Sequence, residues 1–278
     1  MRHTDDSRNH RSDEDEVPPA AIRRVLVTGG DGIIGSVVRR TLADAYELSF
    51  LTLRPASFAS HVGNITRLAS IRPAFRGVDA VVHLAGASSV DSPWEQVLAN
   101  NVVGTYNVFE AARQAGVKRV VYASSNHTIG MYEVEGAPGI YDLDDERAFN
   151  VSVPVRPDSL YGVSKVFGEA LGRLYADRHQ MDVICLRIGA VRESDDPTKA
   201  EAGRPFEPFP VLTTDQSRQR LRAVWLSHRD CAQLIQRALE APVHWAVVYG
   251  VSNNPRRFWD LGAARDLLGY EPLDSAPA

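Results

Sequence analysis

Short apolar runs alternate with longer segments of helical periodicity along most of the chain. We expect strands over residues 24–28, 47–53, 79–85, 119–124, 182–189 and 246–251, and helices over residues 33–45, 93–115, 159–178 and 228–241. The predicted strands are apolar on both faces, which is typical of a parallel sheet that helices cover on both sides. The pattern therefore predicts an α/β protein built on a doubly wound parallel sheet.

A glycine-rich turn follows the first predicted strand and opens the first predicted helix. Residues 25–35 read VLVTGGDGIIG, which places Gly29, Gly32 and Gly35 three residues apart. Glycines here permit a tight turn, a close approach of the backbone to a pyrophosphate and close packing of helix on strand, while the helix N-terminus attracts phosphate. In this strand–turn–helix setting the motif predicts a Rossmann-type dinucleotide site.

The end of the second predicted strand bears on the choice between NAD and NADP. A carboxylate there usually binds the adenosine ribose, but no Asp or Glu lies between residues 48 and 62. Arg54 and Ser57 follow the strand instead, and a guanidinium suits a ribose 2′-phosphate. The residues thus favour NADP or dual use, with the alternative that Arg54 is a solvated surface residue. Asn64 falls where a polar contact to adenine is expected.

Composition divides the chain into three parts. Residues 1–22 are polar, carry six acidic and three basic side chains, and are expected to be a disordered tail. We assign residues 23–190 to the dinucleotide-binding domain with its catalytic residues, and residues 191–278 to a small C-terminal substrate lobe plus returning Rossmann elements. Residues 192–219 are polar and hold four prolines, so we expect no single regular element there, but either a lid or a disordered loop.

Charge and cysteine content exclude several classes of protein. The 278 residues carry a net charge of −4, which argues against a duplex nucleic-acid binder. No run approaches the roughly 18 apolar residues of a membrane span. The two cysteines, Cys185 and Cys231, are far apart and form no C-x-x-C pair, which argues against a disulfide scaffold or a thiolate metal site and favours the reducing cytoplasm.

A tyrosine and a lysine lie one turn apart on the helix predicted over residues 159–178. Residues 161–165 read YGVSK, so Tyr161 and Lys165 share one helix face. An ammonium group close to a phenol stabilises the phenolate and makes the tyrosine a usable proton acceptor. Ser125 ends the fourth predicted strand, where side chains face the ligand crevice, and is expected to hydrogen-bond the reacting oxygen.

In their order along the chain, these motifs resemble those of the extended short-chain dehydrogenases/reductases, the NAD-dependent epimerase/dehydratase superfamily. The resemblance spans residues 23–272 and includes TGGDGIIG at 28–35, HLAG at 83–86, NNVVGTYNV at 100–108, YASS at 122–125, YGVSK at 161–165 and LGYEP at 268–272. Within this superfamily the chain is most similar to the uronate dehydrogenases, on SPWEQVLANNVVGTYNVFEAAR at 92–113, SSNHTIG at 124–130, RPDSLYGVSKVFGE at 156–169, LRIG at 186–189 and WLSH at 225–228.

The resemblance implies a role for each matching residue. The catalytic residues would be Ser125, Tyr161 and Lys165. The sugar would be bound by Ser88 or Ser89, Ser125, Asn126 and His127, with Arg220 gripping its carboxylate. The cofactor would be bound by Gly29, Gly32, Ile33, Ile34, Gly35, Arg54, Asn64, Ile65, Leu84, Ala85, Gly86, Asn101, Tyr161, Lys165 and Ile188.

The chain departs from the uronate dehydrogenase pattern at three places. Ala190 stands where that family tends to have a substrate-contacting serine, the ribose-binding aspartate is missing, and both residues 132–155 and the loop before Arg220 are longer than expected. At the residue level, His127 alternatively caps the strand end, and Arg220 alternatively pairs with an acid of the loop.

The resemblance implies an NAD(P)-dependent oxidoreductase that oxidises the anomeric carbon of glucuronate, galacturonate or a similar sugar acid to the aldarolactone. The cofactor would be NAD, or NADP on the argument from Arg54, as a dissociable cosubstrate. The alternatives are a nucleotide-sugar epimerase or dehydratase with tightly bound NAD, and a non-catalytic redox-sensing protein. The resemblance also implies a cytoplasmic homodimer, formed through the helices over residues 93–115 and 159–178.

Overall fold

The computed structural model describes residues 22–199 and 208–278 and is built around one parallel sheet. Its seven strands follow the order β3-β2-β1-β4-β5-β6-β7, with every neighbouring pair parallel. They are β1 (Arg24–Thr28), β2 (Glu47–Thr52), β3 (His61–Val62), β4 (Ala80–His83), β5 (Arg119–Ser125), β6 (Asp182–Ile188) and β7 (Trp245–Gly250). The order reverses between β1 and β4, and ligands of open α/β sheets bind at such a switch point.

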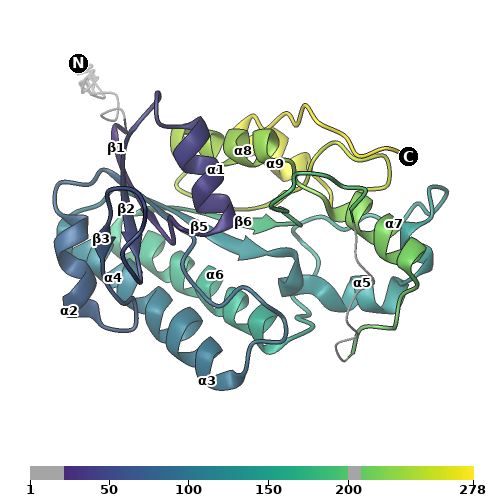
Figure 1. The fold of residues 1–278 in the computed structure, drawn as a ribbon, viewed down its shortest axis with the longest axis horizontal. Helices are drawn as coiled ribbons and strands as arrows, with labels where there is room; N and C mark the ends of the chain where they lie inside the picture. The colour runs from purple at the N-terminus through teal and green to yellow at the C-terminus, as the bar shows by residue number, and fades with distance from the viewer. Residues whose placement is uncertain (1–21, 200–207) are drawn as a thin grey trace, which may run out of the picture.

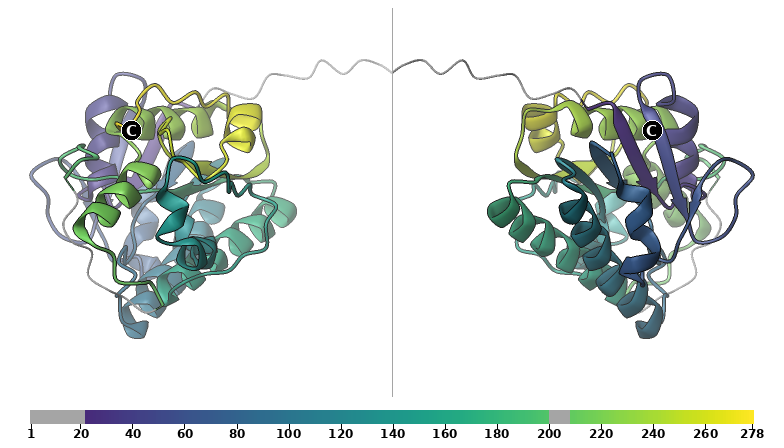
Figure 2. Two further views of the ribbon diagram at one scale, coloured as in Figure 1. Left: turned by 90° about the vertical axis from the view of Figure 1, so that its right-hand side faces the viewer. Right: turned by 90° about the vertical axis from the view of Figure 1, so that its left-hand side faces the viewer.

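Helices cover both faces of this sheet, as the two side views show (Figures 1 and 2). One layer holds α1 (Ile33–Thr41), α8 (His228–Glu240) and α9 (Gly262–Leu268). The other holds α2 (Leu68–Ile71), η1 (Arg72–Phe75), α3 (Trp94–Gln96), η2 (Val97–Val103), α4 (Gly104–Ala115) and α6 (Leu160–His179). Beyond the carboxyl end of the sheet lie η3 (Asn126–Ile129), α5 (Gly130–Gly136), η4 (Gly139–Tyr141) and α7 (Thr214–Val224).

The alternation of side chains along each strand divides the core into two clusters, one on each face. In β1, Val25 and Val27 belong to the cluster under α1 and α8, whereas Leu26 belongs to the cluster under α4. All three side chains are at most 1% exposed. Two covered faces explain why the strands read as continuous apolar runs, so the predicted fold class is confirmed.

Six of the seven strands occupy the predicted positions, whereas the short edge strand β3 and the short helical elements α2, η1, α5, η4 and α9 were not predicted. Three further regions differ from the prediction. The helix predicted over 93–115 is α3, the π-helical η2 and α4 in succession. The helix predicted over 33–45 ends at Thr41. The segment 192–219 ends in the first half of α7, whose capping box joins Thr213 and Gln216. The predicted tail lies outside the described residues apart from Ile22.

No helix among the described residues is long and apolar enough to cross a membrane. The C-terminal part of the chain supplies β7, α8 and α9 to the main sheet and its helical layer, as well as α7 outside it. The division into domains at residue 190 stays a prediction.

A buried ion pair joins α6 to three strands of the sheet. The Arg187 guanidinium of β6 donates to both carboxylate oxygens of Glu169, at 2.9 and 2.8 Å, and both side chains are less than 10% exposed. Ser124 of β5 donates to the same carboxylate at 2.6 Å, and Arg187 also donates to the hydroxyl of Tyr249 in β7 at 3.1 Å. The network therefore sets the position of α6 against β5, β6 and β7.

Replacing Glu169 with alanine is expected to lower the free energy of unfolding by about 3–5 kcal/mol, because the buried Arg187 would lose its carboxylate. The matched control is Asp177→Ala on the same helix, which breaks the exposed Arg173–Asp177 pair and is expected to cost less than about 1 kcal/mol. Urea unfolding followed by circular dichroism measures both. Equal losses in the two variants would contradict a special role for the buried pair.

Candidate active site

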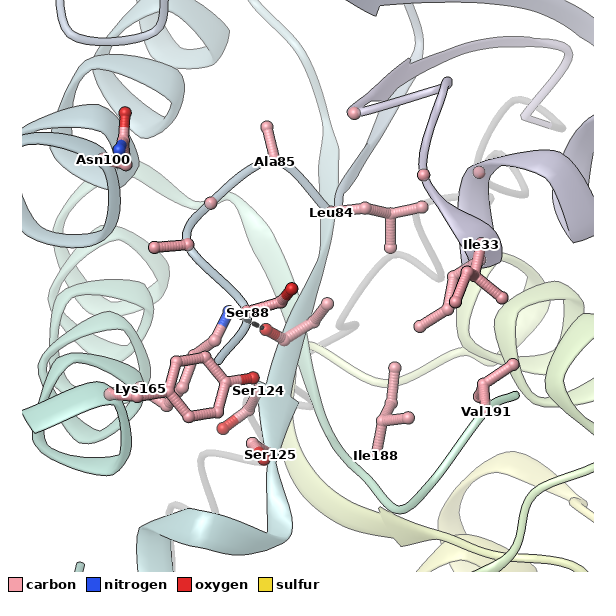
Figure 3. Close-up of a pocket in the computed structure, with 18 of the residues that line it drawn as sticks. Ile33, Leu84, Ala85, Ser88, Asn100, Ser124, Ser125, Lys165, Ile188 and Val191 are labelled. Atoms are coloured by element: carbon pink, nitrogen blue, oxygen red, sulfur yellow. Dashed lines mark hydrogen bonds between the residues drawn. The ribbon is translucent and has the colours of Figure 1, made fainter. Parts of the chain in front are cut away.

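A cavity of about 780 Å³ opens at the carboxyl ends of the central strands. In Figure 3, Ile33, Leu84 and Val191 line one side of it, and Lys165, Ser124 and Ser125 lie on the opposite side. The structure brings most of the predicted site residues together around this cavity. Those that line it are Gly29, Gly32, Ile33, Ile34, Gly35, Asn64, Ile65, Leu84, Ala85, Gly86, Ser88, Ser125, Asn126, His127, Tyr161, Lys165, Ile188 and Arg220.

The glycine turn lies at one end of the cavity and has no room for larger residues at Gly29 and Gly35. Gly29 adopts a φ of +73°, and a Cβ there would lie 2.9 Å from the backbone nitrogen of Ala85. A Cβ on Gly35 would lie 2.4 Å from the carbonyl oxygen of Gly29. The turn thus brings the N-terminus of α1 close to the cavity, and the backbone N–H groups there suit the pyrophosphate of a dinucleotide.

The end of β2 lacks an acidic residue, as the sequence indicates. Leu53, which follows β2, lines the cavity and is 58% exposed. Arg54 is exposed and is absent from the described lining, while its carbonyl accepts a hydrogen bond from Thr52. Asp31 of the glycine turn does line the cavity. The geometry leaves NAD and NADP both open at this end.

Ser125, Tyr161 and Lys165 meet at the other end of the cavity. All three are buried, with exposed fractions of 4%, 8% and 7%. Helix α6 places the Lys165 ammonium 5.5 Å from the centroid of the Tyr161 ring, and its Nζ donates to the carbonyl oxygen of Ala123 at 2.7 Å. The strand β5 ends at Ser125, whose hydroxyl lies within reach of the Tyr161 phenol.

Burial shifts the pKa of both ionisable groups in this set. It raises the pKa of Tyr161, and the hydrogen bond with Ser125 opposes that rise. It lowers the pKa of Lys165 to about 8. The sequence argument named the ammonium as the group that favours the phenolate, whereas in the structure the counteracting contact is the Ser125 hydroxyl. Two groups with shifted pKa values that face one cavity are typical of acid–base chemistry.

His127 lines the cavity beside Tyr161, and a buried acid holds its ring. The two rings meet edge to face with centroids 5.8 Å apart. Nδ1 of His127 lies 2.6 Å from Oδ2 of Asp158, a side chain with no solvent exposure. Oδ1 of Asp158 accepts from Ser159 at 2.8 Å. His127 is therefore more than a cap of the strand end, and Asp158 is a site residue that the sequence analysis did not single out.

Arg220 reaches the cavity from α7 and pairs with a buried acid. Its Nε donates to Oε1 of Glu133 at 2.7 Å and its Nη2 to Oε2 at 3.3 Å. Tyr141 donates to the same carboxylate at 3.0 Å. The sequence analysis gave as an alternative that Arg220 pairs with an acid of the loop before it. Arg220 does pair with an acid, but that acid belongs to α5. A contact across 87 positions of sequence leaves no local signal from which to predict it.

Three predicted site residues lie outside the described lining. Arg54 is one. Ser89 is exposed and accepts from the backbone of Asp91. Asn101 is 1% exposed and clamps a loop to α6, through Ala87 and through Ser164 at 3.0 Å. Its neighbour Asn100 lines the cavity instead.

Among residues 22–199 and 208–278, no group of three His, Cys, Asp or Glu side chains could hold a metal ion.

The chain is similar to a family of known proteins and to several dehydrogenases named for sugars or sugar acids. The model of the NAD dependent epimerase/dehydratase family matches residues 25–192. Two relatives from Haloferax volcanii are the L-arabinose 1-dehydrogenase (NAD(P)(+)), 39% identical over 91% of this chain and 97% of its own, and the NAD-dependent glucose-6-phosphate dehydrogenase, 36% identical over 91% and 94%. A solved structure of a uronate dehydrogenase variant from Agrobacterium tumefaciens, complexed with NAD, is 35% identical with a TM-score of 0.75, covering 92% of this chain and 86% of that one.

Proposed function

The chain belongs to the NAD dependent epimerase/dehydratase family, and from that premise we propose that it oxidises the anomeric carbon of a free monosaccharide to the lactone. It is an NAD-dependent dehydrogenase, as its relatives are. The substrate class comprises hexuronates such as glucuronate and galacturonate, which the resemblance to the uronate dehydrogenases implies, and the neutral aldoses of the same ring size. One observation carries the proposal: Ser125, Tyr161 and Lys165 face the same cavity as the glycine turn.

The residues divide the chemistry of this oxidation between them. A nicotinamide cofactor, when bound, accepts the hydride from the anomeric carbon. Tyr161 takes the proton of the anomeric hydroxyl, and the Ser125 hydroxyl hydrogen-bonds the same oxygen. The Ser125 hydroxyl opposes the rise of the Tyr161 pKa, and the Lys165 ammonium, held by the carbonyl oxygen of Ala123, lies 5.5 Å from the centroid of the Tyr161 ring. Asn126, His127 and Arg220 orient the remaining sugar oxygens.

The cavity supports the binding of a dinucleotide as a dissociable cosubstrate. Gly29 and Gly35, where a Cβ would meet backbone atoms, shape the turn expected to hold the pyrophosphate, and Ile33, Leu84 and Ile188 supply apolar walls. NAD is the cofactor that family membership supports. We propose that NADP is also accepted, because no carboxylate follows β2 to repel a 2′-phosphate and Arg54 lies one residue beyond the lining residue Leu53.

The experiment that tests this function measures reduced cofactor after mixing the protein with each sugar and each cofactor. The sugars are glucuronate, galacturonate, glucose, galactose, L-arabinose and glucose 6-phosphate, each with NAD and with NADP. We expect turnover with at least one free sugar, and the product to be its lactone. A purified protein that carries stoichiometric NAD and reduces no added cofactor would overturn the proposal in favour of an epimerase or dehydratase. Cofactor binding without turnover on any sugar would favour a redox-sensing protein.

Replacing Tyr161 with phenylalanine is expected to lower kcat by about 10²- to 10⁴-fold, because the ring stays in place but the proton acceptor is lost. Binding of NAD, measured by calorimetry, should remain unchanged. The control is Tyr106→Phe, at a tyrosine that is 47% exposed on α4, which should keep full activity. A Tyr161→Phe protein with nearly normal kcat would show that another group takes the proton.

We propose that the protein is a homodimer formed through its exposed helical layer. Trp94 of α3, Tyr106 of α4, and Leu160 and Val163 of α6 are each 46–48% exposed. Helix α6 packs against η2 and α4, so these apolar side chains belong to one helical layer (Figure 1), and exposed apolar groups of this size favour association. Light scattering on the purified protein should give about twice the mass of 30.6 kDa. The mass of a single chain would contradict the dimer.

A further inference from the structure

We propose that Glu133 determines the charge of the accepted sugar: it cancels the charge of Arg220, so that the site prefers neutral aldoses over hexuronates and sugar phosphates. This inference rests on the proposed function and assigns a specificity role to a residue outside the catalytic set. It also changes the role of Arg220 from a receptor for a carboxylate to a donor for sugar hydroxyl groups.

Glu133 is a buried acid whose carboxylate is used inside the protein. Its side chain has no solvent exposure and does not line the cavity. Both of its oxygens accept from Arg220, at 2.7 and 3.3 Å, and Oε1 also accepts from the buried hydroxyl of Tyr141. One edge of the guanidinium, the Nε and Nη2 edge, is thereby occupied before any ligand arrives. That edge is one of those with which an arginine grips a carboxylate bidentately.

Arg220 stays charged in this position, and its charge is balanced. Burial opposes the charged form, but the Glu133 carboxylate and Tyr141 outweigh burial and raise the pKa of Arg220. The guanidinium also lies over the ring of Phe209, 4.9 Å from its centroid. Arg220 and Glu133 together thus carry no net charge, and an anionic sugar group at Arg220 would meet a second carboxylate close behind it.

The second basic group at the sugar end is balanced in the same way. His127 contacts the buried carboxylate of Asp158 at 2.6 Å. The imidazole thus also has a buried carboxylate directly beside it, as the guanidinium of Arg220 does. Two further cationic side chains line the cavity: Lys165, held beside Tyr161 by the carbonyl oxygen of Ala123, and the exposed Arg192, which follows the lining residue Val191 after β6.

Buried donors without net charge suit hydroxyl groups better than carboxylates. A hydroxyl accepts a hydrogen bond from Arg220 and avoids the cost of moving an anion from water next to Glu133. A carboxylate or phosphate loses its hydration when it enters the site. Its attraction to Arg220 is then offset by its repulsion from Glu133, so little binding energy is gained. Selectivity then comes as much from the repulsive group as from the attractive one.

The wild-type protein tests the inference with sugars that differ at one carbon. Glucose is compared with glucuronate, and galactose with galacturonate, because each pair replaces a hydroxymethyl group by a carboxylate. We expect kcat/KM for each hexose to exceed that for its hexuronate by about tenfold or more. The difference should arise from a higher KM for the hexuronate. A preference of that size for either hexuronate, or for glucose 6-phosphate over glucose, would overturn the inference whether or not any variant folds.

The decisive variant is Glu133→Gln, which keeps the size and one acceptor oxygen but removes the charge. We expect the ratio of kcat/KM for hexuronate to that for hexose to rise by about tenfold or more, through a lower KM for the hexuronate. The matched control is Glu135→Gln on the same helix, whose carboxylate pairs with Arg156 at the surface. It should leave the ratio unchanged. A Glu133→Gln protein with the wild-type ratio would overturn the inference while the proposed function stands.

A failure of the proposed function has a different signature. If none of the four sugars is oxidised with NAD or NADP, the affinities for the same sugars are measured by calorimetry on the NAD-loaded protein, which tests the role of Glu133 separately from catalysis. The charge assignment is supported if the wild type binds the hexoses more tightly than the hexuronates and Glu133→Gln reverses that preference. Tighter binding of the hexuronates, or no binding of any of the four, overturns it.

Discussion

The buried contact between Glu169 and Arg187 is the interaction on which the geometry of the site depends. Glu169 lies on the same face of α6 as Tyr161 and Lys165, at successive steps of four residues. Because Ser124 of β5 donates to the Glu169 carboxylate, the helix and the strand are held in one register. The next residue of β5 is Ser125, and that register brings its hydroxyl to the phenol of Tyr161. The relative positions of Ser125, Tyr161 and Lys165 thus depend on the contacts of Glu169, which lies one or two turns further along the helix.

Most of the sheet could be predicted from sequence because its strands are covered on both faces. The runs around Val25–Val27 and Val120–Val121 are apolar without interruption, and the structure buries them completely or nearly so. The helix over 93–115 was expected to be uniform, and a π-helical stretch at its centre has no signature in hydrophobic periodicity. The stretch contains Asn100, which lines the cavity, and Asn101, whose amide donates to Ala87 and Ser164; the sequence analysis named Asn101 and not Asn100.

The parts of the site that the sequence did not reveal lie outside the sheet. Helix α7 is rich in polar residues. Its first half therefore shows no clear apolar periodicity, and the sequence analysis included it in the segment 192–219, where no single regular element was expected. The short α5 supplies Glu133, which gains its meaning only through a contact with Arg220 in a distant part of the chain. Asp158 precedes the catalytic helix and becomes informative once its carboxylate is found against His127. In each case a tertiary contact, and not a local pattern, defines the function of the residue.

These observations separate the origin of the chemistry from the origin of the selectivity. The glycine turn, Ser125, Tyr161 and Lys165 all come from the sheet and its covering helices, and this fold is similar to that of the solved uronate dehydrogenase. Arg220 and Glu133 come from α7 and α5, beyond the carboxyl end of the strands. A change in that outer layer alters the charge presented to the sugar without moving the atoms that exchange the proton. A buried acid is an effective device for this purpose, because it acts on the ligand through its charge while remaining out of contact with it.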